Sequence, residues 1–103
     1  MPSVTQLEVK QTIGTFSASG QAGAAVGVHR FPWKSVQFAG IGAGDSFQLQ
    51  GSNDNVGWVA LGDPVTADGF VDLQVYCHFV RVATTTHAGG NVVTATFAGL
   101  EPN

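Results

Sequence analysis

Residues 46–61 read Ser-Phe-Gln-Leu-Gln-Gly-Ser-Asn-Asp-Asn-Val-Gly-Trp-Val-Ala-Leu and carry the clearest alternation in the chain. Apolar and polar residues alternate over Ser46–Gln50, which predicts a strand with Phe47 and Leu49 facing a core and the polar residues facing water. The Gly-Ser-Asn-Asp-Asn cluster that follows turns the chain, because Asn and Asp tolerate left-handed conformations and bond to their own backbone. Trp58–Leu61 then returns, so the stretch predicts an antiparallel β-hairpin.

The same kind of pattern continues in both directions from this hairpin. Short apolar alternations are separated by Gly, Asn and Asp clusters, and no window keeps the i, i+3, i+4, i+7 spacing of a helix. Val4–Phe16 predicts one or two strands with a bend at Gly14. Phe79–Thr84 is the most strand-like run, and we expect its partner Val92–Phe97 to follow directly across the Gly-rich turn His87–Asn91.

The segments between these strands predict a second tight turn and one long loop. Asp68 and Gly69 are the pair favoured in tight hairpins, which predicts a hairpin between Val65–Thr66 and Phe70–Val71. Ser17–Gly27 consists mostly of small residues with little ordering force. We therefore expect a loop that is either mobile or held by a partner.

Turn signals at intervals of about 8–12 residues predict an all-β fold. We expect a single β-sandwich or jelly-roll-like domain of about eight short antiparallel strands. It is expected to span residues 1–103, with residues 1–10 as a candidate extended arm.

The charge balance excludes several classes of partner. Four Lys and Arg residues stand against seven Asp and Glu, a net charge of −3, so there is no basic stripe for nucleic acid. The longest uncharged stretch, Gln11–His29, is broken by glycines and is too polar to span a membrane. The sequence begins Met-Pro-Ser-Val, without the features of a signal peptide, and we expect synthesis in the cytoplasm. Only 11% of residues are charged, which suits a surface that packs against neighbours.

Candidate catalytic and metal-binding residues follow no pattern that points to chemistry. His29, His78 and His87 have no metal-ligand spacing, and the lone Cys77 lies in an apolar run where a buried structural thiol is expected. Four acidic residues fall in predicted turns, which Asp side chains stabilise: Asp45, Asp54, Asp63 and Asp68. No nucleophile elbow accompanies the hydroxyl groups. We expect a protein that is not an enzyme and that holds no metal and no cofactor.

The large aromatic residues raise the possibility of a binding surface. Trp58 sits amid apolar alternation and is expected in the core. Trp33 follows Phe31 and Pro32, and these three residues are a possible interface anchor. With Tyr76, the tryptophans are also possible platforms for sugar rings.

Two segments together resemble the galactose-binding-like and discoidin-type β-sandwiches. They are the hairpin of residues 47–61 and the strand of residues 79–85. The resemblance implies scaffold roles and no ligand: a structural motif in which three residues shape the turn, a tryptophan packs in the core and an arginine lies on the adjacent strand, at Asn53, Asp54, Gly57, Trp58 and Arg81.

The same pairing, ending in the Thr-rich segment 84–96, resembles small structural proteins of tailed bacteriophages, which include head decoration or cement proteins. This resemblance implies a non-enzymatic virion protein, made in the host cytoplasm, that binds the outer head surface and stabilises the shell. Its expected partners are the major capsid protein and copies of itself in a homotrimer. The alternative is a carbohydrate-binding module of a phage tail or fibre, with a glycan near Trp33, Asn53–Asn55 or His87–Asn91.

Overall fold

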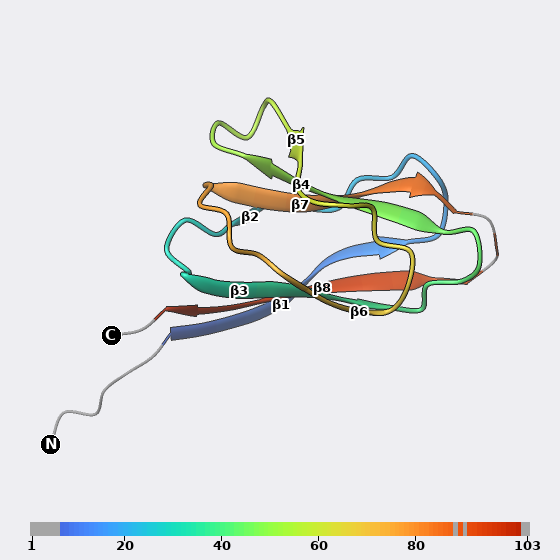
Figure 1. The fold of residues 1–103 in the computed structure, drawn as a ribbon, viewed down its shortest axis with the longest axis horizontal. Helices are drawn as coiled ribbons and strands as arrows, with labels where there is room; N and C mark the ends of the chain where they lie inside the picture. The colour runs from blue at the N-terminus through green and yellow to red at the C-terminus, as the bar shows by residue number, and fades with distance from the viewer. Residues whose placement is uncertain (1–6, 88, 90, 102–103) are drawn as a thin grey trace, which may run out of the picture.

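Two antiparallel four-stranded sheets pack face to face in the computed structural model, and no helix occurs among the described residues 7–87, 89 and 91–101 (Figure 1). The strands are β1 (Leu7–Phe16), β2 (Val26–Gly27), β3 (Trp33–Ala39), β4 (Ser46–Ser52), β5 (Val59–Ala60), β6 (Gly69–Asp72), β7 (Phe79–Thr86) and β8 (Val93–Glu101).

The strand orders are those of a jelly roll. Sheet A has the order β1-β8-β3-β6, and sheet B has the order β2-β7-β4-β5. The chain changes sheet at every connection between consecutive described strands except the one from β4 to β5. Sandwiches of eight strands with such crossing connections are jelly rolls. The predicted fold class is therefore confirmed.

The core fills the space between the sheets with alternate residues of each strand. Phe47 and Leu49 of β4 are 0% and 1% exposed, as their alternation predicts. The Phe47 ring lies 5.4 Å from that of Phe16 and 5.9 Å from that of Phe38, both contributed by sheet A. Burying each such side chain contributes about 1.5–3 kcal/mol, so the alternating strands supply most of the force that holds the sheets together.

The hairpin that the sequence predicts most clearly is present. β4 and β5 pair antiparallel, with Gln50 opposite Ala60 and Gly51 opposite Val59. Cys77 lies beneath it, only 6% exposed, with its Sγ 3.5 Å from the carbonyl oxygen of Phe79. The thiol is buried, as expected.

The predicted pairing of β7 with β8 is wrong. β7 lies between β2 and β4 in sheet B, whereas β8 lies between β1 and β3 in sheet A. Both strands bury one apolar face, with Val80 and Val82 on β7 and Val93 and Ala95 on β8. The sequence pattern is the same for two neighbours in one sheet and for two strands that face each other across a core.

The predicted hairpin at Asp68 and Gly69 is also wrong. Val65 forms a bridge with Phe47 of sheet B, whereas Gly69 begins β6 and pairs with Phe38 of sheet A. The chain therefore crosses from one sheet to the other here. The Asp68 carboxylate accepts a hydrogen bond of 2.8 Å from the backbone N–H of Ile41 instead of closing a tight turn.

The first strand has its irregularity where the sequence places a bend. The register of β1 against β8 shifts between Thr12 and Gly14. Of the candidate arm, residues 7–10 belong to β1 and pair with β8, and residues 1–6 lie outside the described residues.

The Ser17–Gly27 segment is held by its own chain, which corrects the expectation of a mobile or partner-held loop. Gly23 donates a backbone hydrogen bond of 2.8 Å to Val82, and Thr84 donates one of 2.8 Å to Gln21. The loop therefore adds backbone hydrogen bonds to the edge of sheet B. On its other side, the absence of a side chain at Gly23 leaves room for the backbone carbonyl of Ile13 in β1.

Candidate functional site

The turn between β4 and β5 is organised by one carboxylate. Asp54 Oδ1 accepts hydrogen bonds of 2.9 Å from the backbone N–H groups of both Val56 and Gly57, and one of 3.0 Å from the Ser52 hydroxyl. These bonds favour the ionised form, and they lower the pKa of Asp54 below its ordinary value, the backbone bond from Gly57 contributing most. Asn55 completes the turn in the left-handed region, with φ at 61°.

The adjacent residue of this turn ties it to a segment distant in the sequence. Asn53 Oδ1 accepts a hydrogen bond of 3.1 Å from the backbone N–H of His78, just before β7. A Cβ added to Gly57 would meet nothing within 4 Å, so the space around this residue does not demand glycine. The turn geometry comes mainly from Ser52 and Asp54.

Trp58 does not pack in the core, contrary to expectation. It is half-buried, and the Arg81 guanidinium carbon lies 4.3 Å from the centre of its ring. Arg81 alternates with the buried Val80 and Val82 and therefore faces outward from sheet B. Its Nε donates a hydrogen bond of 2.7 Å to Gln50 Oε1, so the tryptophan covers an outward-facing polar pair.

A recess of about 440 Å³ opens between this turn and the segment before β7. Asn53 and Asp54 line one side, with Val59 and Tyr76 beside them. The tyrosine is 71% exposed, and its ring meets the His78 ring edge-on at 6.0 Å. The sequence predicts Tyr76 as an aromatic platform. Its position beside the β4–β5 turn could not be predicted, because it depends on connections that cross between the two sheets.

The three residues of the possible interface anchor divide between core and surface. Phe31 is 2% exposed and packs edge-on against Phe97 at 5.9 Å, so it is a core residue and does not form part of a surface anchor. Pro32 is exposed, and Trp33 is 58% exposed. Within β3, the pleat points successive side chains to opposite faces, so Trp33 points outward and Lys34 points inward. The Lys34 Nζ donates a 3.0 Å hydrogen bond to the Phe31 carbonyl.

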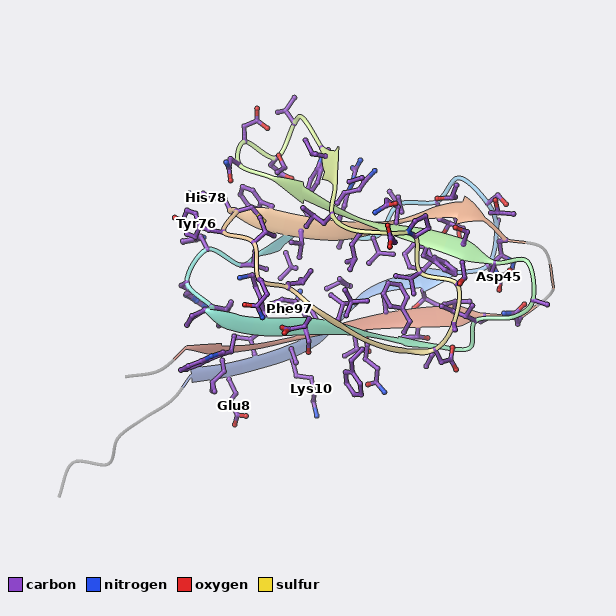
Figure 2. The ribbon with its side chains drawn as sticks, in the orientation of Figure 1. Glu8, Lys10, Asp45, Tyr76, His78 and Phe97 are labelled. Atoms are coloured by element: carbon purple, nitrogen blue, oxygen red, sulfur yellow. The ribbon has the colours of Figure 1, made fainter. Side chains whose placement is uncertain are left out.

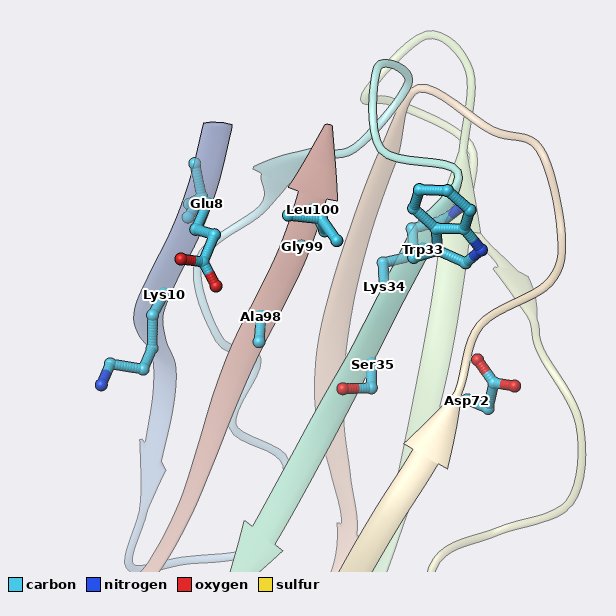
Figure 3. Close-up of a pocket in the computed structure, with 10 residues that line it drawn as sticks. Glu8, Lys10, Trp33, Lys34, Ser35, Asp72, Ala98, Gly99 and Leu100 are labelled. Atoms are coloured by element: carbon cyan, nitrogen blue, oxygen red, sulfur yellow. The ribbon is translucent and has the colours of Figure 1, made fainter. Parts of the chain in front are cut away.

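Trp33 stands beside a groove of about 490 Å³ on the outer face of sheet A (Figure 3). Glu8 and Lys10 of β1 form the opposite wall and point away from the sandwich (Figure 2). Ala98 and Gly99 of β8 form the floor between them. The small residues at positions 98 and 99, between strands that carry longer side chains, create this groove, and Leu100 of β8 also lines it.

A buried polar cluster at the opposite end of the sandwich from Tyr76 was missed by the sequence reasoning (Figure 2). Asp45 Oδ2 accepts hydrogen bonds from the Gly42 backbone at 2.9 Å and from Asn91 Nδ2 at 3.0 Å. His87 Nδ1 lies 3.9 Å from Asp45 Oδ1, and its Nε2 lies 2.7 Å from the Asn91 carbonyl oxygen. The cluster ties the loop before β4 to the loop before β8. No spacing in the sequence relates residues so far apart.

The histidines are placed in two separate environments. His29 and His78 stack with ring centres 4.8 Å apart, whereas His87 belongs to the cluster with Asp45. Among the residues that the structure describes, no group of three or more His, Cys, Asp and Glu could hold a metal ion. Within the same residues, no helix is long and apolar enough to cross a membrane.

Comparison with known proteins gives one relationship, through the fold. No family model matches the sequence, and no curated protein matches it. The structure is similar to the crystal structure of SPBc2 prophage-derived protein YomS, with a TM-score of 0.81. The two chains share a fold. The match covers 98% of this chain and 99% of YomS at 13% sequence identity, so the whole jelly roll is common to both.

Proposed function

We propose that this chain is a non-enzymatic structural protein of a tailed-bacteriophage virion, which coats the outer surface of the head and stabilises the shell. The observation that carries the proposal is the agreement of the whole fold, over 98% of one chain and 99% of the other, with a prophage-derived protein. The agreement extends over all of the jelly-roll fold and is not confined to one part of it. The resemblance of residues 46–100 to phage decoration proteins supports the same role.

The surface chemistry suits a protein that packs against flat neighbours. Charged residues make up 11% of the chain, so little electrostatic repulsion keeps copies apart. Trp33, Phe70 and Tyr76 expose 58%, 74% and 71% of their surfaces, and aromatic side chains of this kind dominate the energetics of protein interfaces. The partners in this proposal are the major capsid protein and further copies of the chain.

The proposal is tested with purified protein and heads that lack it. We expect the protein to sediment with the heads, to saturate at a fixed ratio to the capsid protein, and to raise the temperature at which the heads release DNA. An unrelated β-sandwich of similar size serves as the control. Protein that stays in the supernatant at every concentration would contradict the proposal.

The recess beside Tyr76 supports a second candidate, a carbohydrate-binding role on a tail or fibre. An exposed ring next to an amide and a carboxylate provides a stacking surface and hydrogen-bond partners for sugar hydroxyls. In a glycan array this candidate predicts binding that Tyr76→Ala abolishes and Phe70→Ala, an equally exposed aromatic on sheet A, leaves intact. Trp33→Ala tests the other aromatic platform in the same assay.

A further inference from the structure

The outer face of sheet A carries its side chains in rows that the strand register fixes. Lys10 lies opposite Ala98, Ala98 lies opposite Ser35, and Ser35 lies opposite Asp72. Paired residues of neighbouring strands point to the same face of a sheet. The row therefore has an ammonium at the β1 edge, a carboxylate at the β6 edge and two small side chains between them.

The neighbouring row contains the projecting side chain of Trp33, which lies beside the groove on this face. Glu8, Leu100 and Trp33 share it, again by register. Trp33 rises from β3 beside the groove of about 490 Å³, whose floor lies over β8. Projection and groove thus sit side by side on one face, about one strand spacing of 4.8 Å apart.

We propose that a second copy of this chain packs on this face, related by a two-fold axis that runs along the sheet between β8 and β3. The rotation reverses the order of the strands, so β1 of one copy faces β6 of the other and β8 faces β3. Lys10 then lies opposite Asp72 of the second copy, and the same contact occurs twice. Each Trp33 lies over Leu100 of the other copy's β8, a residue that lines the groove.

The charge at the β6 edge favours this axis over the other in-plane axis. A two-fold axis across the strands would place β1 over β1 and β6 over β6. Because β6 is Gly69–Asp72 and carries no cation, the Asp72 carboxylate would then lie opposite no positive charge of the other copy's β6. Along the strands, the Lys10 ammonium comes between Glu8 of its own strand and Asp72 of the other copy.

A second copy fits this face better than a different protein because the complementary features belong to the same surface. A projection beside a groove and a cation opposite an anion are what a self-complementary, closed interface requires. The face is four strands wide and about seven residues long, or roughly 19 by 23 Å. Pairing then buries on the order of 1,000 Å² in total, at the lower limit for a specific interface, so we expect micromolar affinity.

This pairing identifies the surface through which copies of the chain would associate, and it rests on the self-association in the proposed function. Its test is the mass of the protein in solution by sedimentation velocity and light scattering, up to several hundred micromolar. Wild-type protein is expected to reach about twice the chain mass of 10.6 kDa. Trp33→Ala is expected to weaken the dimer by at least about tenfold.

A charge exchange keeps the test independent of folding defects. Lys10→Asp and Asp72→Lys should each weaken the dimer, and the double variant should restore it. Asp72 also accepts a 2.6 Å hydrogen bond from Gln74 Nε2, so Asp72→Asn serves to measure the loss of its charge with the amide contact retained. Tyr76→Ala, which removes an exposed aromatic from outside the face, should leave the mass unchanged.

Each of three results would overturn the pairing: a monomer throughout, a dimer insensitive to these variants, or three times the chain mass, as in the homotrimer that the phage resemblance implies. Binding to heads is measured separately. A monomer that still binds heads would therefore refute the pairing and leave the decoration role intact. A dimer that does not bind heads would support the pairing and refute the decoration role.

Discussion

At the scale of single residues, the best-defined interactions surround the β4–β5 turn. Asp54 accepts hydrogen bonds from two backbone N–H groups and one hydroxyl. Its carboxylate thus takes the place of backbone carbonyl acceptors for N–H groups within the turn. Arg81 and Trp58 form the second contact of this region, joined to Gln50 through the guanidinium. Both features lie on the surface, and both give predictions in solution.

The first prediction concerns pH. Because these hydrogen bonds lower the pKa of Asp54 from its ordinary value of 3.8, its ionised form is favoured in the folded state. The resulting stability is fully present above pH 3.8 and is lost as the pH falls through the lower folded pKa. Asp54→Ala should therefore lower Tm at pH 7, and the difference in Tm from wild type should shrink with acidification. A difference that is constant from pH 7 to pH 2 would contradict this role.

The second prediction concerns the stacked pair. In a double-mutant cycle measured by urea unfolding, Arg81→Ala and Trp58→Leu should show a coupling of about 0.5–1 kcal/mol, as expected for a partly exposed cation–π contact. Arg81→Lys keeps the charge but not the planar stacking, and should retain part of the coupling. Additive effects of the two substitutions would show that the contact contributes nothing to stability.

At the scale of strands, the sequence predicts which residues are buried better than it predicts which strands pair. Alternation identifies the inward residues of β4, and the Asn-Asp turn identifies its hairpin with β5. The pattern of β7 and β8 is equally strong, yet they lie in different sheets, because alternation reports one buried face and not the neighbouring strand. The same ambiguity explains the error at Asp68 and Gly69.

The candidate site shows the same division. The sequence predicts an exposed Trp33 but also an exposed Phe31, although the Phe31 side chain is buried against Phe97. The position of Trp58 amid apolar alternation predicts that it lies in the core, whereas it precedes β5 and covers the outward-facing Arg81. The groove, the recess and the Asp45 cluster each depend on contacts between segments far apart in the sequence, which local patterns do not report.

The third prediction belongs to the core that the strands enclose. Phe47→Ala removes a fully buried ring that touches aromatic residues of the other sheet, and should cost about 3–5 kcal/mol of unfolding free energy. This is a large part of the 5–15 kcal/mol that is usual for a domain, so denaturant midpoints should fall steeply. Val56→Ala, at a residue 80% exposed, should change the unfolding free energy by less than about 0.5 kcal/mol.

At the scale of the whole molecule, the jelly roll separates three surfaces. The outer face of sheet A carries the self-complementary rows, one end of the sandwich carries the recess beside Tyr76, and the other end is closed by the Asp45 cluster. A protein that coats a shell needs contacts to its copies and to the shell on different faces. The arrangement therefore suits a small module that fills a repeating position on a larger surface.

The proposed role places this module on the outer surface of a phage head. The most direct measurement is a cryo-electron-microscopy map of the virion that contains the chain, compared with a map of particles lacking its gene. We expect density on the outside of the head that fits the eight-stranded sandwich and disappears in the deletion. Identical head density in the two maps, or density found only on the tail, would contradict it.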